Sequence, residues 1–522
     1  MLGAQLVRML KELNNKFLLA SVFVTGTAVL IIEIIAIRIL SSHYGNTIYT
    51  TSSVIGIVLA ALSLGYYFGG VISDKYPDRR IFYSIIFVSG FLVIFMHILA
   101  KTLLPLLSIL FSIVQGPLIF SILLFFMPAF FLGTLSPFAI KLYHLDRAET
   151  DTVGKHSGQV FFWSTVGSII GSLLSGFWLI PHFGINAIVM GTGISLGLWG
   201  LFGFLIFKLI SKKIIIAIIL IFVSQILLLI LYLPKKQSNV LYEKDGFYER
   251  IKISDGLWQG NPTRFLFQDI SYSAAMYLNS SELVYQYTKY YELYKLLVPQ
   301  AKNAFIIGGG AYSIPKALLK DLPDIKIDVT EIEPELFKLA KKYFNLQDTT
   351  RLANYTEDGR RFLNKSPKKY DIIISDVYYS FFQIPIHFTT KEFFSLAKNR
   401  LLDNGVVIGN FVGNIDAESP SFTLSEIRTF KDIFPNSYFF AVDSPESKKA
   451  QNIIFLGING NKKIDINNSK IKKNPDSIIN DLAHKNIDLS KFNFSYYKEL
   501  TDDFSPIEYL VSRAINQQYN TW

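Results

Sequence analysis

The chain has 522 residues, of which 50% are hydrophobic and 18% charged, so it is too long for one small domain and too apolar to be disordered. It has no cysteine, which excludes disulfide bonds, thiolate catalysis and cysteine-ligated zinc or iron–sulfur sites. Residues 1–233 hold 14 Lys and Arg against 7 Asp and Glu, and the rest of the chain holds 37 against 34. The basic excess therefore flanks apolar sequence, which favours a phospholipid surface and argues against nucleic acid as a partner.

Apolar runs of about 20 residues predict a multi-pass membrane domain over residues 1–234, with lipids as partners. Seven spans are expected, near 17–39, 50–73, 81–100, 118–140, 159–181, 185–207 and 213–233. The shorter apolar run 103–115 is an eighth span, a re-entrant piece or a surface helix. Six glycines within the spans predict small helix faces that allow close contact: Gly65, Gly69, Gly70, Gly167, Gly171 and Gly176.

The orientation of these spans stays open between two alternatives. Basic residues gather near 8–16, 75–80, 141–155 and 208–213. With seven spans all four clusters lie on one side, which the positive-inside rule makes cytoplasmic, and the C-terminal half is then outside. With eight spans the C-terminal half returns to the cytoplasm, but the last two clusters then lie on the opposite face.

The C-terminal half has an ordinary globular charge balance and two kinds of pattern. Short strands with turns predict a small β-rich subdomain over 235–280. From 281 to 522, strands alternate with helices, which predicts an α/β Rossmann-like domain with a doubly wound parallel sheet. The expected fold class is thus an α-helical polytopic membrane domain followed by a Rossmann-like domain with a small β-rich subdomain at its start.

A glycine turn and three acids mark the candidate site. The buried strand 303–307 runs into Gly308, Gly309 and Gly310, after which a helix opens, so a ligand can approach bare backbone at a helix N-terminus. The next three strands end at Glu331, Asp358 and Asp376. The carboxyl ends of parallel strands share one edge of a sheet, so we expect these acids to converge there. Taken singly, each acid is equally well read as a solvated loop residue or a helix cap.

Several runs together resemble a known family. IIGGGAYSIPKALL, VTEIEPELFKLAKKYF, TEDGRRFL, YDIIISDVYYSFFQIPIHFTTKEFF and LLDNGVVIGNF are similar to the catalytic domain of spermidine synthases, the polyamine aminopropyltransferases, whose fold is of the S-adenosylmethionine-dependent methyltransferase type. With the early spans and the tail LTDDFSPIEYL, the chain resembles the membrane-fused spermidine synthase-like proteins. The resemblance covers most of the chain, with the motifs in the same order.

The resemblance implies a role for each motif residue. It makes Asp376 the general base and assigns the remaining positions to the cofactor or the acceptor. The implied cofactor-binding residues are Gly308, Gly309, Gly310, Glu331, Glu333, Asp358 and Gly359, and the implied substrate-binding residues are Tyr285, Gln286, Tyr378 and Tyr379.

Three positions depart from the family pattern. Ala311 and Tyr379 stand where the family has aspartates that hold ammonium groups, and Ser273 stands where it has a glutamine. Two carboxylates that, by the resemblance, would hold the ammonium groups of the cofactor tail and of a diamine are therefore absent. For this reason the acceptor stays open between a polyamine and an amphiphilic amine.

The expected function is membrane-anchored aminopropyl transfer, in polyamine biosynthesis or a related route, from decarboxylated S-adenosylmethionine to a small-molecule amine. The alternatives are methyl or aminocarboxypropyl transfer from S-adenosylmethionine itself, or a transporter or sensor with a degenerate synthase domain.

No metal is expected, because the seven histidines show no metal-ligand spacing. We expect a protein of the cell inner membrane with its catalytic domain in the cytoplasm, where the cofactor is supplied. The number of subunits, including a homo-oligomer, stays open.

Overall fold

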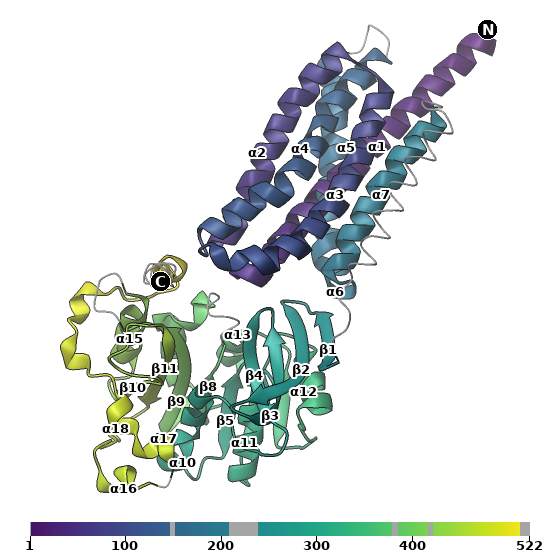
Figure 1. Cartoon of the computed structure of the whole chain (residues 1–522). Helices are drawn as coiled ribbons and strands as arrows, with labels where there is room; N and C mark the ends of the chain where they lie inside the picture. The colour runs from purple at the N-terminus through teal and green to yellow at the C-terminus, as the bar shows by residue number, and fades with distance from the viewer. Residues whose placement is uncertain are drawn as a thin grey trace. The chain divides into compact units, whose positions relative to one another are not determined.

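The computed structural model describes residues 2–146, 152–207, 238–377, 385–415, 421–474 and 476–511 (Figure 1). The chain divides into two compact units, Met1–Lys236 and Gln237–Trp522. Each unit is considered by itself. The first is helical, and the second combines helices with two sheets.

Within its described residues the first unit has six helices long and apolar enough to cross a membrane. The helices are α1 (Leu2–Tyr44), α2 (Ile48–Lys75), α3 (Arg79–Leu107), α4 (Gln115–Leu145), α5 (Val153–Leu174), which continues through the π turn Ser175–Leu179 into α6 (Ile180–His182), and α7 (Ile185–Ile206). The expected span 213–233 lies outside the described residues. These helices make the first unit the membrane-associated part of the chain.

The eighth-span reading of 103–115 is wrong. Its first residues complete α3, and Ser108–Leu110 form one 3-10 turn before α4 begins at Gln115. Pro105 lies inside α3 and near its end, where only the last turn follows it. The apolar residues here finish one helix and connect it to the next, so they are too few to form another span.

Four of the six predicted glycines lie in close helix contacts. A β-carbon at Gly65 or Gly69 of α2 would lie 2.4 Å from a backbone oxygen of α4, at Phe130 and Thr134 respectively. Gly167 and Gly171 of α5 meet the backbone of α1 at similarly short range. At Gly70 and Gly176 an added β-carbon would meet nothing within 4 Å among the described residues, so the predicted contact is not seen there. Periodicity alone did not reveal which face of each helix has a neighbour.

The second unit begins with the small antiparallel sheet that the sequence predicts. Its strands, in the order β1-β2-β3-β4, are β1 (Val240–Asp245), β2 (Arg250–Trp258), β3 (Asn261–Gln268) and β4 (Ser271–Tyr277). Ile251, Ile253 and Leu266 of this sheet are buried against α12 (Leu336–Tyr343). Short helical segments follow: α9 (Gln286–Lys289), η3 (Tyr290–Leu293) and α10 (Tyr294–Leu297). The apolar face of the small sheet thus fixes it to the larger α/β core.

The larger sheet has seven strands in the order β10-β11-β9-β8-β5-β6-β7. They are β5 (Asn303–Ile307), β6 (Lys326–Thr330), β7 (Leu352–Tyr355), β8 (Tyr370–Ser375), β9 (Leu401–Gly413), β10 (Ser437–Ala441) and β11 (Gln451–Ile458). The connecting helices are α11 (Ser313–Asp321), α12, α13 (Gly359–Lys365), α14 (Lys391–Asn399) and α15 (Phe422–Ile433), and the short helices α16 (Ser469–Lys472), α17 (Ser477–Asn480) and α18 (Leu482–Lys485) follow β11.

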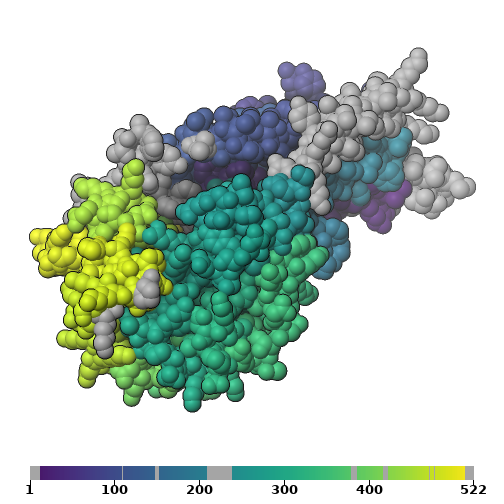
Figure 2. Space-filling model, turned by 60° about the horizontal axis from the view of Figure 1, so that its bottom comes forward, coloured from purple at the N-terminus to yellow at the C-terminus, as the bar shows by residue number. Residues whose placement is uncertain are grey.

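The sheet is mixed, so the expectation of a wholly parallel sheet is wrong at one edge. Five strands are parallel, but β11 pairs antiparallel with both β9 and β10. The chain turns directly back from β10 to β11 without a crossover helix, and such a return gives an antiparallel pair. The C-terminal residues, yellow in Figures 1 and 2, lie at this edge of the unit.

The strand order places the candidate site. β5 pairs with β6 on one side and with β8 on the other, so the direction of winding reverses beside β5. In open α/β sheets ligands bind outside the carboxyl ends of the strands at such a reversal. The glycine turn follows β5 and Asp376 follows β8, so both lie at this point.

Candidate active site

The glycine turn packs directly on the end of β8. Gly308 has a φ of +90°, and a β-carbon there would lie 2.2 Å from the backbone oxygen of Asp376. Gly310 also has a positive φ, and Tyr312 takes the left-handed conformation just before α11 begins. A residue with a β-carbon is therefore excluded from position 308 by both conformation and space. The turn leaves its backbone open to a ligand on the cavity side.

Glu331 lies across this turn. Its Oε2 accepts hydrogen bonds from the backbone N–H groups of Gly309 (2.9 Å) and Gly310 (3.1 Å), and its Oε1 accepts one from the N–H of Glu333 (2.9 Å). The side chain is buried, which raises its pKa, although these backbone donors oppose the rise. Glu331 is thus held in one position by main-chain groups.

Glu333 does not join the cavity, contrary to the implied role. Its side chain is 1% exposed, and Oε2 accepts a hydrogen bond from the backbone N–H of Tyr248, in the turn between β1 and β2. Burial raises the pKa of this carboxyl. Both acids follow the last residue of β6, Thr330, so the side-chain alternation of a strand does not place them on one face, and here the second acid faces the small sheet.

Asp358 is both a helix cap and a cavity residue. Its Oδ1 accepts a hydrogen bond from the backbone N–H of Arg361 (2.8 Å) at the start of α13, and its Oδ2 lies 2.9 Å from Nε2 of His387. Burial acts to raise the pKa of Asp358, but the hydrogen bonds from His387 and from the helix backbone outweigh it, so the pKa is lowered. The following residue, Gly359, packs against Ile307 of β5 so closely that a β-carbon would overlap it.

Asp376 has a different environment. It lines the cavity, the amide of Asn410 lies 3.4 Å from its Oδ1, and the hydroxyls of Tyr291 and Tyr287 also act to lower its pKa. Loss of hydration raises its pKa to about 6, against the lowering effect of these donors. Asn410 is held in turn by Nδ2 of Asn452, which donates to its Oδ1 (2.9 Å). A carboxyl that titrates near neutrality can accept a proton under physiological conditions.

A cavity of about 400 Å³ connects these groups. Its walls come from the glycine turn, the ends of β6, β7 and β8, strand β4 and the segment 283–288. The lining includes the acids Glu331, Glu357, Asp358 and Asp376, and the described lining residues include no lysine, arginine or histidine. The cavity is therefore suited to a cationic ligand. No group of three or more His, Asp or Glu within the described ranges is placed to hold a metal ion.

The predicted substrate residues divide into three groups. Tyr285 lines the cavity, is 9% exposed, and its hydroxyl has no hydrogen-bond partner among the described residues; burial raises its pKa. Gln286 is exposed and lies outside the cavity, because the chain turns into α9 at this residue. Tyr378 and Tyr379 lie outside the described residues.

Sequence reasoning missed several lining residues that surround Asp376. Tyr287 and Asn410 contact its carboxyl, and Asn452 supports Asn410 from the antiparallel strand β11. Tyr287 lies two residues from Tyr285, so the aromatic spacing in SSELVYQYTKYY was the available signal. Gln268 also lines the cavity near Ser273, and its amide bonds the buried Glu249.

Residues 291–468 match the spermine/spermidine synthase domain. The chain contains a spermine/spermidine synthase domain. The glycine turn, Glu331, Asp358, Asp376 and Asn410 all lie within the matched residues, whereas Tyr285 and the small sheet precede them.

Three curated relatives resemble this chain. A polyamine aminopropyltransferase of Vibrio vulnificus is 28% identical over 155 residues, which are 28% of this chain and 48% of the relative. Polyamine aminopropyltransferase 2 of Aquifex aeolicus is 24% identical over 407 residues, 74% of this chain and 77% of the relative. An N-terminal histidine N-methyltransferase of Emericella nidulans is 36% identical over 154 residues, 27% of this chain and 26% of the relative.

The alignments differ in extent. The chain spans about half the length of the Vibrio relative and about a quarter of the Emericella one. The Aquifex alignment is too long to be confined to the synthase domain and extends well beyond residues 291–468.

Proposed function

We propose that the synthase domain transfers an aminopropyl group from decarboxylated S-adenosylmethionine to an amine. The observation that carries this proposal is the charge of the cavity: four carboxylates line it, with no basic side chain among its described lining residues. A sulfonium compound with an aminopropyl tail is cationic at both its sulfur and its amine. Such a ligand fits an anionic cavity better than any anionic cofactor does.

The same charge pattern discriminates between the two sulfonium donors. S-adenosylmethionine carries an α-carboxylate, which would enter a cavity that offers it four negative side chains and no described cationic partner. The decarboxylated compound lacks this group. The cavity therefore favours the decarboxylated donor and, with it, aminopropyl transfer over methyl transfer.

Glu331 and Asp358, which we call the nucleoside end of the cavity, would hold the adenosine part of the donor. Glu331 would accept hydrogen bonds from ribose hydroxyls, and Asp358 would accept one from the adenine amino group. The open backbone of Gly308–Gly310 allows the sulfur to lie close to the end of β8. Both acids are already held by backbone or side-chain donors, so little ordering is needed when a ligand binds.

Asp376 would accept the proton of the attacking amine. The amine nitrogen forms a bond to the propyl carbon next to sulfur, the carbon–sulfur bond breaks with its electrons going to sulfur, and methylthioadenosine leaves as a neutral thioether. Asp376, whose pKa of about 6 lets the carboxylate be present at neutral pH, takes a proton from the ammonium form of the acceptor before this attack, which frees the electron pair of the nitrogen, and the product amine stays protonated. Holding both reactants in one cavity supplies most of the remaining rate enhancement.

Ligand binding to the purified full chain tests this proposal. We expect decarboxylated S-adenosylmethionine and methylthioadenosine each to raise the thermal unfolding midpoint, and S-adenosylmethionine to raise it less. If no adenosyl compound stabilises the protein, aminopropyl, methyl and aminocarboxypropyl transfer are all ruled out. Mass spectrometry of molecules that copurify with the protein would identify the acceptor class.

Methyl or aminocarboxypropyl transfer from S-adenosylmethionine is the second candidate. Ala311, which lines the cavity, removes a carboxylate that would hold an aminopropyl ammonium group, and one relative of the chain is named as an N-methyltransferase. Equal or stronger stabilisation by S-adenosylmethionine would favour this candidate.

The six apolar helices support a protein of the cell inner membrane, with lipids around the first unit. We place the synthase domain in the cytoplasm, because the proposed donor is a cytoplasmic metabolite. Protease accessibility of residues 238–511 in sealed, oriented vesicles would test the side, and digestion from the periplasmic face alone would contradict it.

A further inference from the structure

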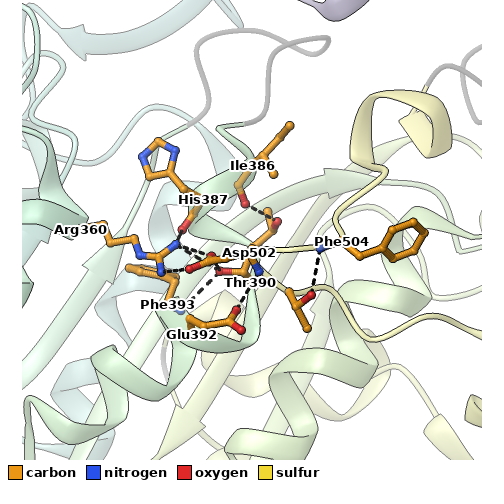
Figure 3. A network of polar contacts seen from close by, with 10 residues as sticks. Arg360, Ile386, His387, Thr390, Glu392, Phe393, Asp502 and Phe504 are labelled. Carbon is orange, nitrogen blue, oxygen red and sulfur yellow. Dashed lines mark hydrogen bonds and ion pairs between the residues drawn. The ribbon is translucent and has the colours of Figure 1, made fainter.

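Three segments that are far apart in the sequence meet beside the cavity (Figure 3). They are the start of α13, the 3-10 turn η4 (Ile386–Phe388) with the start of α14, and the C-terminal segment 500–504. Only Asp358, in the first segment, has a part in the proposed transfer. The contacts between the segments show what the other two contribute.

Arg360 is the centre of this network. Its guanidinium group donates to both carboxylate oxygens of Asp502, at 2.7 and 2.5 Å. Nη1 also reaches the backbone oxygen of His387 (3.0 Å) and Oγ1 of Thr390 (3.3 Å). Thr390 is fully buried and donates its hydroxyl to Asp502 at 2.8 Å. One arginine thus joins the C-terminal segment to the turn that carries His387 (Figure 3).

The C-terminal segment is itself fixed in place. The backbone N–H of Asp502 donates to Glu392 of α14 (3.0 Å), and the oxygen of Leu500 accepts from the N–H of Lys391 (2.8 Å). Leu500 is buried in a small core with Phe422 and Ile507. Asp502 is therefore presented to Arg360 from a packed segment.

The network reaches the cavity through His387. Its backbone oxygen is held by Arg360, and its ring Nε2 lies 2.9 Å from Oδ2 of Asp358. The neighbouring Phe388 lines the cavity, as Asp358 does. The side chains of His387 and Asp358 are 47% and 30% exposed, and the His387 ring packs on its neighbour in the same turn, Phe388, with ring centroids 4.4 Å apart. The position of the ring therefore depends on how the backbone of residue 387 is held.

We propose that Arg360 and Asp502 are positioning residues for the nucleoside end of the cavity. They hold the backbone of His387, and this places the imidazole where it fixes the Asp358 carboxylate. The carboxylate then accepts a hydrogen bond from the amino group of an adenine ring. This inference rests on the proposed function. It also assigns a role to the sequence LTDDF, whose first aspartate is Asp502.

A double-mutant cycle tests this proposal, with affinity of the purified full chain for methylthioadenosine as the measurement. We expect Asp502→Asn to weaken binding about fivefold and His387→Ala about tenfold, because each loses a charge-assisted contact. If Asp502 acts through His387, adding Asp502→Asn to His387→Ala should weaken binding less than about twofold further. A merely structural role for Asp502 would instead give additive losses.

Glu499→Gln is the matched control. It removes the ion pair of Glu499 with Lys391 (2.8 Å), which also joins the C-terminal segment to α14 but does not contact Arg360. We expect wild-type affinity for this variant. Equal loss in Glu499→Gln and Asp502→Asn, or additive effects in the cycle, would overturn the positioning role.

The outcomes separate this inference from the proposed function. Wild-type protein that binds methylthioadenosine while Asp502→Asn binds it equally well would overturn the positioning role and leave the proposed function intact. Wild-type protein that binds no adenosyl compound would overturn both.

Discussion

Asp358 follows β7 and Asp376 follows β8, at the same edge of one sheet, and both line one cavity, yet their pKa values move in opposite directions. Asp358 accepts hydrogen bonds from a helix N-terminus and from His387, and these keep its pKa low. Asp376 is desolvated more strongly than its amide and hydroxyl donors can offset, and its pKa rises to about 6. A permanently charged carboxylate suits binding, and one that titrates near neutrality suits proton transfer.

Replacement of Asp376, the proposed proton acceptor, should have the largest effect, and this effect should be on turnover. We expect Asp376→Asn to lower turnover by about 10²- to 10⁴-fold, because it removes the proton acceptor but keeps the shape of the side chain. Affinity for methylthioadenosine should stay within about twofold of wild type. Turnover close to wild type would show that another group, or water, takes the proton.

Replacement of Asp358, at the nucleoside end, should lower affinity more than turnover. We expect Asp358→Ala to weaken binding of methylthioadenosine by about tenfold to a hundredfold, because a charged acceptor and a helix cap are both lost. Turnover at saturating donor should fall far less than it does in Asp376→Asn. A variant that loses turnover but keeps its affinity would reverse the roles assigned to the two aspartates.

The pH dependence of turnover sharpens the comparison. The base must be ionised, so turnover should rise with pH through an acid limb near pH 6. The amide of Asn410 favours the ionised form of Asp376, so Asn410→Ala should move this limb to higher pH. Measurement of kcat/KM against pH for both proteins checks the shift, because kcat/KM reports the pKa values of the free enzyme. A limb that moves to lower pH in the variant would contradict the hydrogen bond from Asn410 to Asp376.

A buried carboxyl outside the cavity, Glu426, provides the smallest expected effect. Glu426 in α15 is fully buried, neither of its oxygens has a hydrogen-bond partner among the described residues, and burial raises its pKa well above the usual range. The folded state therefore binds this proton more tightly than the unfolded chain does, so stability falls as pH rises above the unfolded pKa, about 4.3.

Glu426→Met should remove that dependence. We expect its thermal unfolding midpoint to rise by a few degrees relative to wild type at pH 8 and by less at pH 5. Equal midpoints at both values of pH would show that the carboxyl is stabilised by a partner. Asp376, by contrast, accepts a hydrogen bond from the amide of Asn410 and should show no comparable gain when it is replaced.

The sequence predicted the site residues that directly follow the carboxyl ends of parallel strands. Gly308–Gly310, Glu331, Asp358 and Asp376 converge because β5 to β8 are parallel and their carboxyl ends share one edge. Strand alternation is visible along the chain, so this part of the fold followed from local patterns.

The site residues that the sequence did not predict are placed mainly by contacts between segments that are far apart in the sequence. Asn452 reaches Asn410 only because β11 runs antiparallel beside β9, and the strand pattern does not show that pairing. Gln286 was predicted in place of Tyr287, because the point at which the helix begins decides which side chain turns inward. The contact of Asp502 with Arg360 spans 142 positions and leaves no periodic signal.

The close approach of Gly308 to the backbone of Asp376 has a consequence for how the site could change over evolution. The turn at Gly308, on which we propose that the donor sulfur lies, is in close contact with the peptide of Asp376, the proposed base, so neither can be displaced without the other. New acceptors would therefore have to be accommodated by exchanging side chains on the opposite wall, around β4 and residues 283–288, while the reach from sulfur to base stays constant.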